Sequence, residues 1–317
     1  GPADCAALPN PAELFEWLSH YDLLGFQAQR DLSNLSESAR QLMDVEPLGH
    51  DRMRLGGRLV RLGVFPVGID ASAFMQEARD APDEDRMRTL TGAQMMIGVD
   101  RLDYSKGIPQ RFRAFQILLE NHPDMIERIA FLQIAPPTRE AVAAYRDIRE
   151  ETEHLAGRIN GEYATINWTP IRFIHRSLPR RILAGLYRQA HIGLVTPLAD
   201  GMNLVAKEYV AAQNVTNPGV LILSRFAGAA DTMQEALVIN PHDPWELAEA
   251  MAIAMRMGAN ERRRRHAALL RDVVEHDVGW WSATYLDALE RAAAERGQAV
   301  DVSSTDQQDQ SDPFVQR

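Results

Sequence analysis

Hydrophobic and polar positions follow two different patterns along this chain, and the change between them falls near Gly92. Beyond that residue, short apolar runs of strand length take turns with longer segments that have helical spacing. Predicted strands cover 95–99, 129–135, 171–175, 192–196, 220–224 and 236–240, and predicted helices cover 109–122, 139–160, 179–190, 202–213, 244–257 and 260–275. Strict alternation of strands and helices predicts an α/β domain built on a doubly wound parallel sheet.

The residues before Gly92 show the weaker pattern. The spacing predicts helices at 12–19 and up to about residue 43, strands at 21–26 and 59–69, and a helix followed by a linker over the charged stretch 70–92. A boundary near Gly92 therefore separates a small N-terminal part from the doubly wound domain.

Composition narrows the class of protein. The 317 residues are 45% hydrophobic and 25% charged, which excludes collagen-like and wholly disordered chains. Lys and Arg number 34 and Asp and Glu 44, so the net charge is −10 and we expect no nucleic-acid partner. Any anionic ligand must bind at a local basic site.

Cysteine content and hydropathy indicate in which cellular compartment we expect the protein. The single Cys5 excludes an internal disulfide and a structural zinc site. No apolar run reaches the roughly 18 residues of a membrane span, and the first residues lack the layout of a secretory signal. We therefore expect a cytoplasmic protein with no membrane partner, and the sequence leaves open whether it forms a homo-oligomer.

The first candidate site follows the predicted strand 95–99. In doubly wound sheets, ligands bind beyond the carboxyl ends of the strands. The loop after this strand carries Arg101 and Lys106 and leads into a helix N-terminus. Backbone N–H groups, the helix dipole and two cations together favour a phosphate or diphosphate. The alternative is that these cations form surface salt bridges with Asp100 and Asp103.

The second candidate site is the segment 196–208, which also joins a strand end to a helix start. Amides near its helix start lack intrahelical partners and can bind sugar hydroxyls or phosphate oxygens, and Asp200 can accept from a hydroxyl. Glu208 is a carboxylate of the kind that nucleotide sites use for ribose hydroxyls. The alternative makes Asp200 a helix N-cap and Glu208 a surface charge that compensates the dipole.

Two weaker features lie at the same edge of the predicted sheet. Arg139 follows the strand 129–135, and the small-residue loop 224–230 follows another strand and allows either close approach of a ligand or tight packing. Motifs typical of P-loop ATPases, simple dehydrogenases, zincins and serine hydrolases are absent from the sequence, which argues against those classes.

Four segments carry a family resemblance. GVDRLDYSKGIPQRF, AGRINGEYATINWTPI, GLVTPLADGMNLVAKEYVAAQ and NPGVLILSRFAGAA closely resemble motifs of trehalose-6-phosphate synthases, and the similarity extends from 21–27 to 276–289. The resemblance implies a retaining glycosyltransferase of the GT-B fold, with two Rossmann-like domains. It also implies the partners UDP-glucose and glucose 6-phosphate, the product trehalose 6-phosphate, and chemistry without a cofactor or metal.

The resemblance assigns roles residue by residue. The catalytic set is Arg101, Lys106 and Asp200: the two cations bind the donor diphosphate and stabilise departing UDP, and Asp200 holds glucosyl hydroxyls. The remaining donor-binding residues are Leu178, Leu183, Gly201, Met202, Asn203, Leu204, Val205, Ala206, Lys207 and Glu208. Leu183 presents its backbone to uracil, and Glu208 holds the ribose. Arg139 reaches the phosphate of glucose 6-phosphate.

The resemblance also sets the expected domains. Only about 92 residues precede the boundary, whereas a Rossmann-like domain needs about 150–200. We expect 1–92 to be a partial acceptor-side domain, 93–278 the nucleotide-sugar-binding domain, 279–296 a helix that packs back toward the N-terminal part, and 297–317 a disordered tail. On this interpretation the chain by itself has little synthase activity. The alternative is a non-catalytic nucleotide-sugar-binding fragment or subunit that needs a complementary N-terminal chain.

Overall fold

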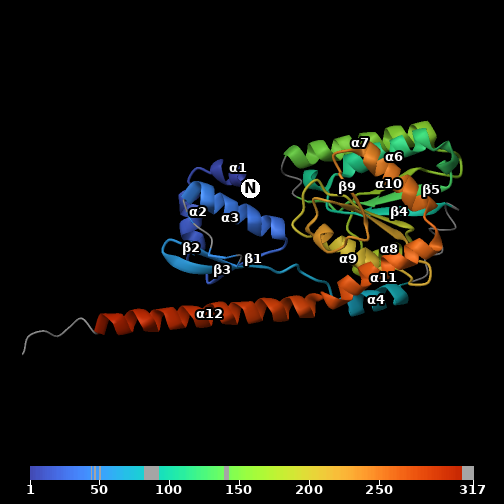
Figure 1. Cartoon of the computed structure of the whole chain (residues 1–317). Coiled ribbons are helices and arrows are strands. Elements are labelled where there is room, and N and C mark those ends of the chain that lie inside the picture. Colours follow the sequence, from blue (N-terminus) through green and yellow to red (C-terminus); the bar gives the residue numbers. More distant parts are fainter. Residues whose placement is uncertain (44, 46–47, 50, 82–92, 139–142, 309–317) are drawn as a thin grey trace, which may run out of the picture. The chain divides into compact units, whose positions relative to one another are not determined.

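The computed structural model describes the chain except for residues 44, 46–47, 50, 82–92, 139–142 and 309–317. Contacts between residues divide it into two compact units (Figure 1). The smaller unit combines Gly1–Pro66 with Trp280–Arg317, and the larger unit is Val67–Gly279. Each unit has its own sheet.

The smaller unit is built on a three-stranded sheet. Its strands are β1 (Leu23–Phe26), β2 (Arg52–Leu55) and β3 (Arg58–Val64), in the order β1-β3-β2, with β1 parallel and β2 antiparallel to β3. Its helices are α1 (Pro2–Ala6), α2 (Pro11–Leu18), α3 (Gln29–Met43) and α12 (Val278–Gln308) from Trp280 onward. Gly56 and Gly57 link β2 to β3 with positive φ at both positions, which this type of tight hairpin requires.

Aromatic and charged contacts hold α12 in the smaller unit. Trp281 Nε1 donates to the Phe65 carbonyl at 3.1 Å, so this tryptophan anchors the helix. The Tyr285 ring meets the Phe65 ring edge-on, with centroids 5.2 Å apart. Glu295 forms ion pairs with Arg61 and Arg52. These contacts fix the helix along more than three of its turns.

The larger unit contains a six-stranded parallel sheet, and all the predicted strands are confirmed. The strand order is β6-β5-β4-β7-β8-β9. The bounds are β4 (Gln94–Val99), β5 (Ile129–Ile134), β6 (Ile171–Ile174), β7 (Ile192–Val195), β8 (Val220–Ser224) and β9 (Leu237–Ile239). Central strands such as β5 are buried along their whole length, because helices cover both faces of the sheet.

The helices of the larger unit form a layer on each face of its sheet (Figure 1). One layer consists of α6 (Ile108–Asn121), α7 (Ala143–Tyr163) and α10 (Pro244–Arg256). The other consists of α4 (Ala71–Asp80), α8 (Arg180–Gln189), α9 (Leu204–Ala212) and α11 (Ala259–Glu275). The short 3-10 helices are η1 (Tyr104–Lys106), η2 (Pro123–Met125) and η3 (Gly228–Asp231). This arrangement is the doubly wound architecture that the alternation predicts.

The division between the units differs from the expected boundary near Gly92. It falls between Pro66 and Val67, because α4 packs into the larger unit with Phe74 fully buried. The expected strand 59–69 likewise ends at Val64 as β3. Beyond it the backbone is bound to the larger unit: the Ile69 carbonyl accepts from Val278 N–H at 3.0 Å.

Helix α12 extends into the segment 297–317, where we expect a disordered tail: it continues through Gln308, and no proline interrupts it. Each residue added to an existing helix gains a backbone hydrogen bond without a new nucleation step, so a polar composition alone does not end it. Residues 309–317 lie outside the described residues. None of the helices in the described part of the chain has both the length and the apolar composition to cross a membrane.

A buried histidine on α11 makes stability dependent on pH. His266 is 4% exposed, and its Nε2 lies 3.0 Å from the Val210 carbonyl of α9, so that nitrogen carries the proton. Burial lowers the pKa of His266 below the ordinary value of 6.5. The unfolded chain therefore takes up a proton near pH 6.5 that the folded chain does not, and we expect the free energy of unfolding to fall as the pH drops below that value.

The test is urea unfolding of the wild type and His266→Gln between about pH 7.5 and pH 5.5. Glutamine retains a donor for the Val210 carbonyl, so the variant should lose stability less steeply on acidification, by about 1.4 kcal/mol for each unit of pKa depression removed. His154→Gln, on the exposed face of α7, serves as the control and should retain the wild-type pH dependence. Equal slopes for wild type and His266→Gln would contradict this account.

Candidate functional site

The strand order places β4 beside β7, although β5 and β6 lie between them in the chain. This position is the topological switch point of the sheet, beyond which ligands bind in doubly wound folds. The loops that leave the two strands touch: Leu198 N–H donates to the Ser105 carbonyl at 2.7 Å. Gly107 has a φ of 68°, and a Cβ there would lie 2.7 Å from the Thr196 carbonyl oxygen, so this approach requires glycine.

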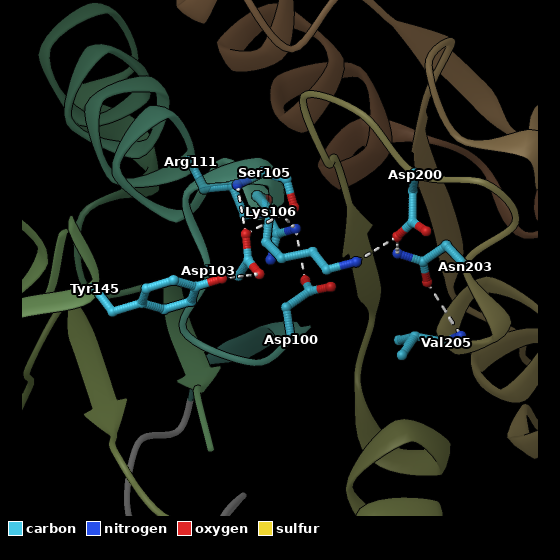
Figure 2. Close-up of polar contacts among 9 residues, drawn as sticks. All are labelled: Asp100, Asp103, Ser105, Lys106, Arg111, Tyr145, Asp200, Asn203 and Val205. Carbon is cyan, nitrogen blue, oxygen red and sulfur yellow. Dashed lines mark hydrogen bonds and ion pairs between the residues drawn. The ribbon is translucent and has the colours of Figure 1, made fainter. Parts of the chain in front are cut away.

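A buried ion pair underlies the two loops (Figure 2). Arg111 Nη2 lies 2.7 Å from Asp100 Oδ2, and both side chains are almost completely buried. The same guanidinium donates to Thr196 Oγ1 at 2.8 Å, to Gln133 Oε1 at 3.2 Å and to the Lys106 carbonyl at 3.0 Å. Burial raises the pKa of Asp100, and the charge of Arg111 opposes that effect. One side chain thus joins the ends of β4, β5 and β7 to η1.

Above this pair, a second ion pair joins the two loops. Lys106 Nζ lies 2.6 Å from Asp200 Oδ2, and the two side chains are 15% and 17% exposed (Figure 2). Asp200 Oδ2 also accepts from Asn203 Nδ2 at 3.0 Å. Asn203 is the N-cap of α9, with Oδ1 accepting from Val205 N–H at 3.1 Å. The ammonium therefore lies beside the N-terminus of α9, and we call this set of residues the Lys106–Asp200 corner.

The loop of small residues after β8 holds the second loop in place. Asp200 N–H donates to the Phe226 carbonyl, and Gly228 N–H donates back to the Asp200 carbonyl, both at 3.1 Å. Ala229 N–H donates to the Met202 carbonyl at 2.9 Å. The small residues of 224–230 thus allow close packing of backbone on backbone, which orients Asp200 toward Lys106.

Asp103 shapes the first loop and does not pair with the cations. Its carboxylate accepts from Ser105 N–H and Oγ, both at 2.9 Å, and from Tyr145 Oη at 3.1 Å. Burial opposes ionisation, but these hydrogen bonds lower the pKa of Asp103 below its usual value. Within the described residues, neither Asp100 nor Asp103 forms a salt bridge with Arg101 or Lys106, so the surface salt-bridge interpretation does not hold there.

The structure does not bring every predicted residue into the corner. Arg101 is exposed and makes no hydrogen bond or ion pair with the described residues. Glu208 lies on the second turn of α9, half-buried, and burial raises its pKa while Arg180 opposes the effect. Lys207 is 1% exposed, and its Nζ donates to the Val67 carbonyl at 2.9 Å, so its ammonium is engaged away from Asp200. Burial lowers the pKa of Lys207.

The remaining predicted positions differ in exposure. Gly201 and Leu204 are exposed, Met202 and Ala206 are buried, and Leu178 and Leu183 pack half-buried against the core on the α8 face. Leu183 N–H donates to the Pro179 carbonyl at 3.1 Å in the first turn of α8. Arg139 lies outside the described residues. In the part of the chain that the structure describes, no group of three His, Cys, Asp or Glu side chains is placed to hold a metal ion.

Sequence reasoning missed Arg111, the residue that fixes the geometry of the corner. A signal was present in the sequence. Arg111 lies on the face of α6 that also carries Ile108, Phe112 and Phe115, all fully buried. A charged residue at a core-facing position of an amphipathic helix indicates a buried partner.

A comparison with known proteins shows the family of this chain. The family model of Glycosyltransferase family 20 matches residues 5–291. A trehalose-6-phosphate synthase of Sodalis glossinidius is 43% identical over 299 residues, which cover 93% of this chain and 64% of that protein. The chain therefore spans about 64% of the length of this curated relative.

Two solved structures are similar over nearly all of the chain. The α,α-trehalose-phosphate synthase (UDP-forming) of Burkholderia xenovorans in complex with glucose-6-phosphate has a TM-score of 0.87 and 42% identity, and covers 92% of this chain and 66% of its own. A trehalose-6-phosphate protein of E. coli bound with UDP-2-fluoro glucose has a TM-score of 0.84 and 41% identity, with coverages of 91% and 65%. These likenesses confirm the expected α/β fold of the GT-B type.

The buried pair makes a prediction about stability. Arg111→Met leaves Asp100 buried without its counter-ion, and we expect a loss of about 3–5 kcal/mol in the free energy of unfolding, measured by urea denaturation. Arg113→Met, two residues along the same helix, removes only an exposed pair with Glu151 and should change stability little. Adding Asp100→Leu to Arg111→Met should recover part of the loss. A single Arg111→Met variant as stable as Arg113→Met would contradict the role assigned to the pair.

Proposed function

The chain belongs to glycosyltransferase family 20, and from this premise we propose that it transfers glucose from UDP-glucose to glucose 6-phosphate. The products are trehalose 6-phosphate and UDP, and the configuration of the transferred glucose is retained. The observation that carries the proposal is the Lys106–Asp200 corner, a cation and a carboxylate beside a helix N-terminus at the switch point. Relatives solved with glucose-6-phosphate and with UDP-2-fluoro glucose support the choice of substrates.

Lys106 is the principal ligand of the donor diphosphate in this proposal. Its ammonium is already fixed at the N-terminus of α9, where backbone N–H groups and the helix dipole favour anions. Exposed Arg101, on the same loop, adds a second cation at the rim. Cations held in place before the reaction stabilise the charge that develops on departing UDP, because no reorganisation is needed at that moment.

Asp200 changes partner when the donor binds. In the structure its carboxylate accepts from Lys106 and from Asn203. A diphosphate competes for the ammonium, and the carboxylate can then accept from glucosyl hydroxyls in place of Lys106. The ion pair thus keeps both side chains oriented until the donor binds. The donor then contacts Lys106 through its diphosphate and Asp200 through its glucosyl group.

The chemical step requires no protein nucleophile. The bond between the glucosyl anomeric carbon and the diphosphate oxygen breaks, and a bond from that carbon to the acceptor hydroxyl oxygen forms on the same face. The hydroxyl proton passes to a phosphate oxygen of the leaving UDP. Glu208 holds the ribose and the start of α8 lies against the base.

We also propose that the protein lies in the cytoplasm, a reducing compartment that suits a free Cys5.

The donor assignment predicts separable effects at the two ends of the ion pair. Lys106→Ala should raise the Kd for UDP about tenfold or more, because hydrogen bonds to charged groups contribute about 1.5–3 kcal/mol. Asp200→Asn should not weaken UDP, because it removes the carboxylate that competes for Lys106, but it should weaken UDP-glucose, because the sugar needs the carboxylate. Calorimetric titration of the intact chain measures both, with Arg113→Ala as a surface control. Unchanged UDP affinity in Lys106→Ala would refute the donor site.

A coupled assay of UDP release tests the transfer itself. UDP formation from UDP-glucose by the chain alone should be slow, should depend on glucose 6-phosphate and should fall further in Lys106→Ala. UDP binding without any release would favour the alternative interpretation, a nucleotide-sugar-binding fragment or subunit. In that case, adding a complementary N-terminal chain distinguishes a split enzyme, which recovers turnover, from a binding protein, which does not.

A further inference from the structure

A cavity of about 440 Å³ lies at the other edge of the six-stranded sheet, where the strands begin. Its walls include Ala190 and His191 just before β7, Gly219 just before β8, and residues of α4, α8 and α11. The Lys106–Asp200 corner lies beyond the opposite ends of the strands, so the two sites are separated by the length of β7. The volume falls in the range of small-molecule sites, about 300–1,000 Å³.

Three arginines line the cavity: Arg79, Arg188 and Arg262. Among the residues that the structure describes, no Asp or Glu lines it. None of the three guanidinium groups forms an ion pair within the described residues. Their hydrogen bonds go to neutral acceptors: Gln76 Oε1, the Ala212 carbonyl and Asn217 Oδ1. Arg264 and Arg265, on the same helix as Arg262, are instead paired with Glu235 and Glu261.

Two buried polar atoms at this cavity have no partner among the described residues. These are Gln189 Oε1, an acceptor, and Arg262 Nε, a donor. Buried polar atoms are almost always hydrogen-bonded, and each exception calls for an explanation. Both atoms are buried within residues that line one cationic cavity, and an unsatisfied donor and acceptor there favour a ligand with both an anionic and a hydroxyl group.

We propose that this cavity binds a small phosphate ester of a polyhydroxylated molecule. Arg188 and Arg262 bind the phosphate, Arg79 adds charge at the mouth, and Gln189 Oε1 accepts from a ligand hydroxyl. Guanidinium groups match phosphate geometry, and their hydrogen bonds to it are charge-assisted. The site does not depend on the proposed donor site, because no residue belongs to both.

Calorimetric titration of the intact chain tests the proposal, with inorganic phosphate and glycerol 3-phosphate as probes. Lys106→Ala serves as the background, which removes the competing cation at the corner. In that background both probes should bind saturably, and glycerol 3-phosphate should bind more tightly. Adding Arg188→Gln and Arg262→Gln together should weaken both at least about tenfold, since two charge-assisted contacts are lost. Binding should also weaken as salt is raised.

Two further variants separate a specific site from general charge loss. Arg263→Gln removes the neighbouring charge of α11 outside the cavity and should leave both affinities unchanged. Gln189→Leu should weaken glycerol 3-phosphate but not inorganic phosphate, a contrast that a misfolded variant does not produce. The proposal is overturned if the Lys106→Ala chain shows no saturable binding, or if the double arginine variant binds as tightly as Arg263→Gln.

Discussion

The Lys106–Asp200 corner depends on one buried charge pair, Asp100 with Arg111. Two charges in a water-poor interior need both each other and further hydrogen bonds. Asp100 Oδ2 depends on the ion pair with Arg111, since it has no hydrogen bond among the described residues. Arg111 also bonds to Thr196, Gln133 and the Lys106 carbonyl. Each of those partners belongs to a different element of the switch point. A guanidinium with fixed donor directions therefore determines where the loops after β4 and β7 lie relative to one another.

This constraint has a direct consequence for chemistry. Because Arg111 binds the carbonyl of Lys106, the backbone of that residue cannot shift without breaking a buried hydrogen bond. The buried contacts of Arg111, and not the loop alone, thus hold the Lys106 ammonium beside Asp200 and the N-terminus of α9. In the proposed transfer, a leaving diphosphate would meet a cation and helix amides that are already oriented, which is the condition under which electrostatic stabilisation of departing charge is strongest.

The sequence predicts the sheet and the loops better than the contacts between them. Strand and helix periodicity is local, so all the strands of the larger unit follow from spacing. The placement of 100–107 and 196–203 at the carboxyl edge of the sheet follows from the same pattern, whereas the adjacency of β4 and β7 comes from the structure. Arg111 and Lys207 depend instead on partners far along the chain. The Lys207 ammonium bonds to the Val67 carbonyl, 140 residues away in the sequence. The local motif alone predicts only that Lys207 binds the donor. The boundary at Pro66–Val67 was missed for the same reason, since it is set by the burial of Phe74 against α8 and α9.

The two edges of the parallel sheet also differ in electrostatics, and this bears on the arginine-lined cavity. Helices begin at the carboxyl edge and end at the other, so partial negative charge gathers where the strands start. Arg188, which donates to the last helical carbonyl of α9, at Ala212, is accounted for by that field alone. Arg262 is not, because it lies in the first turn of α11, the positive end of its helix, where a cation is unfavourable. The anion proposed for the cavity would offset the charge of Arg262 at this position, where its Nε is buried and has no partner among the described residues.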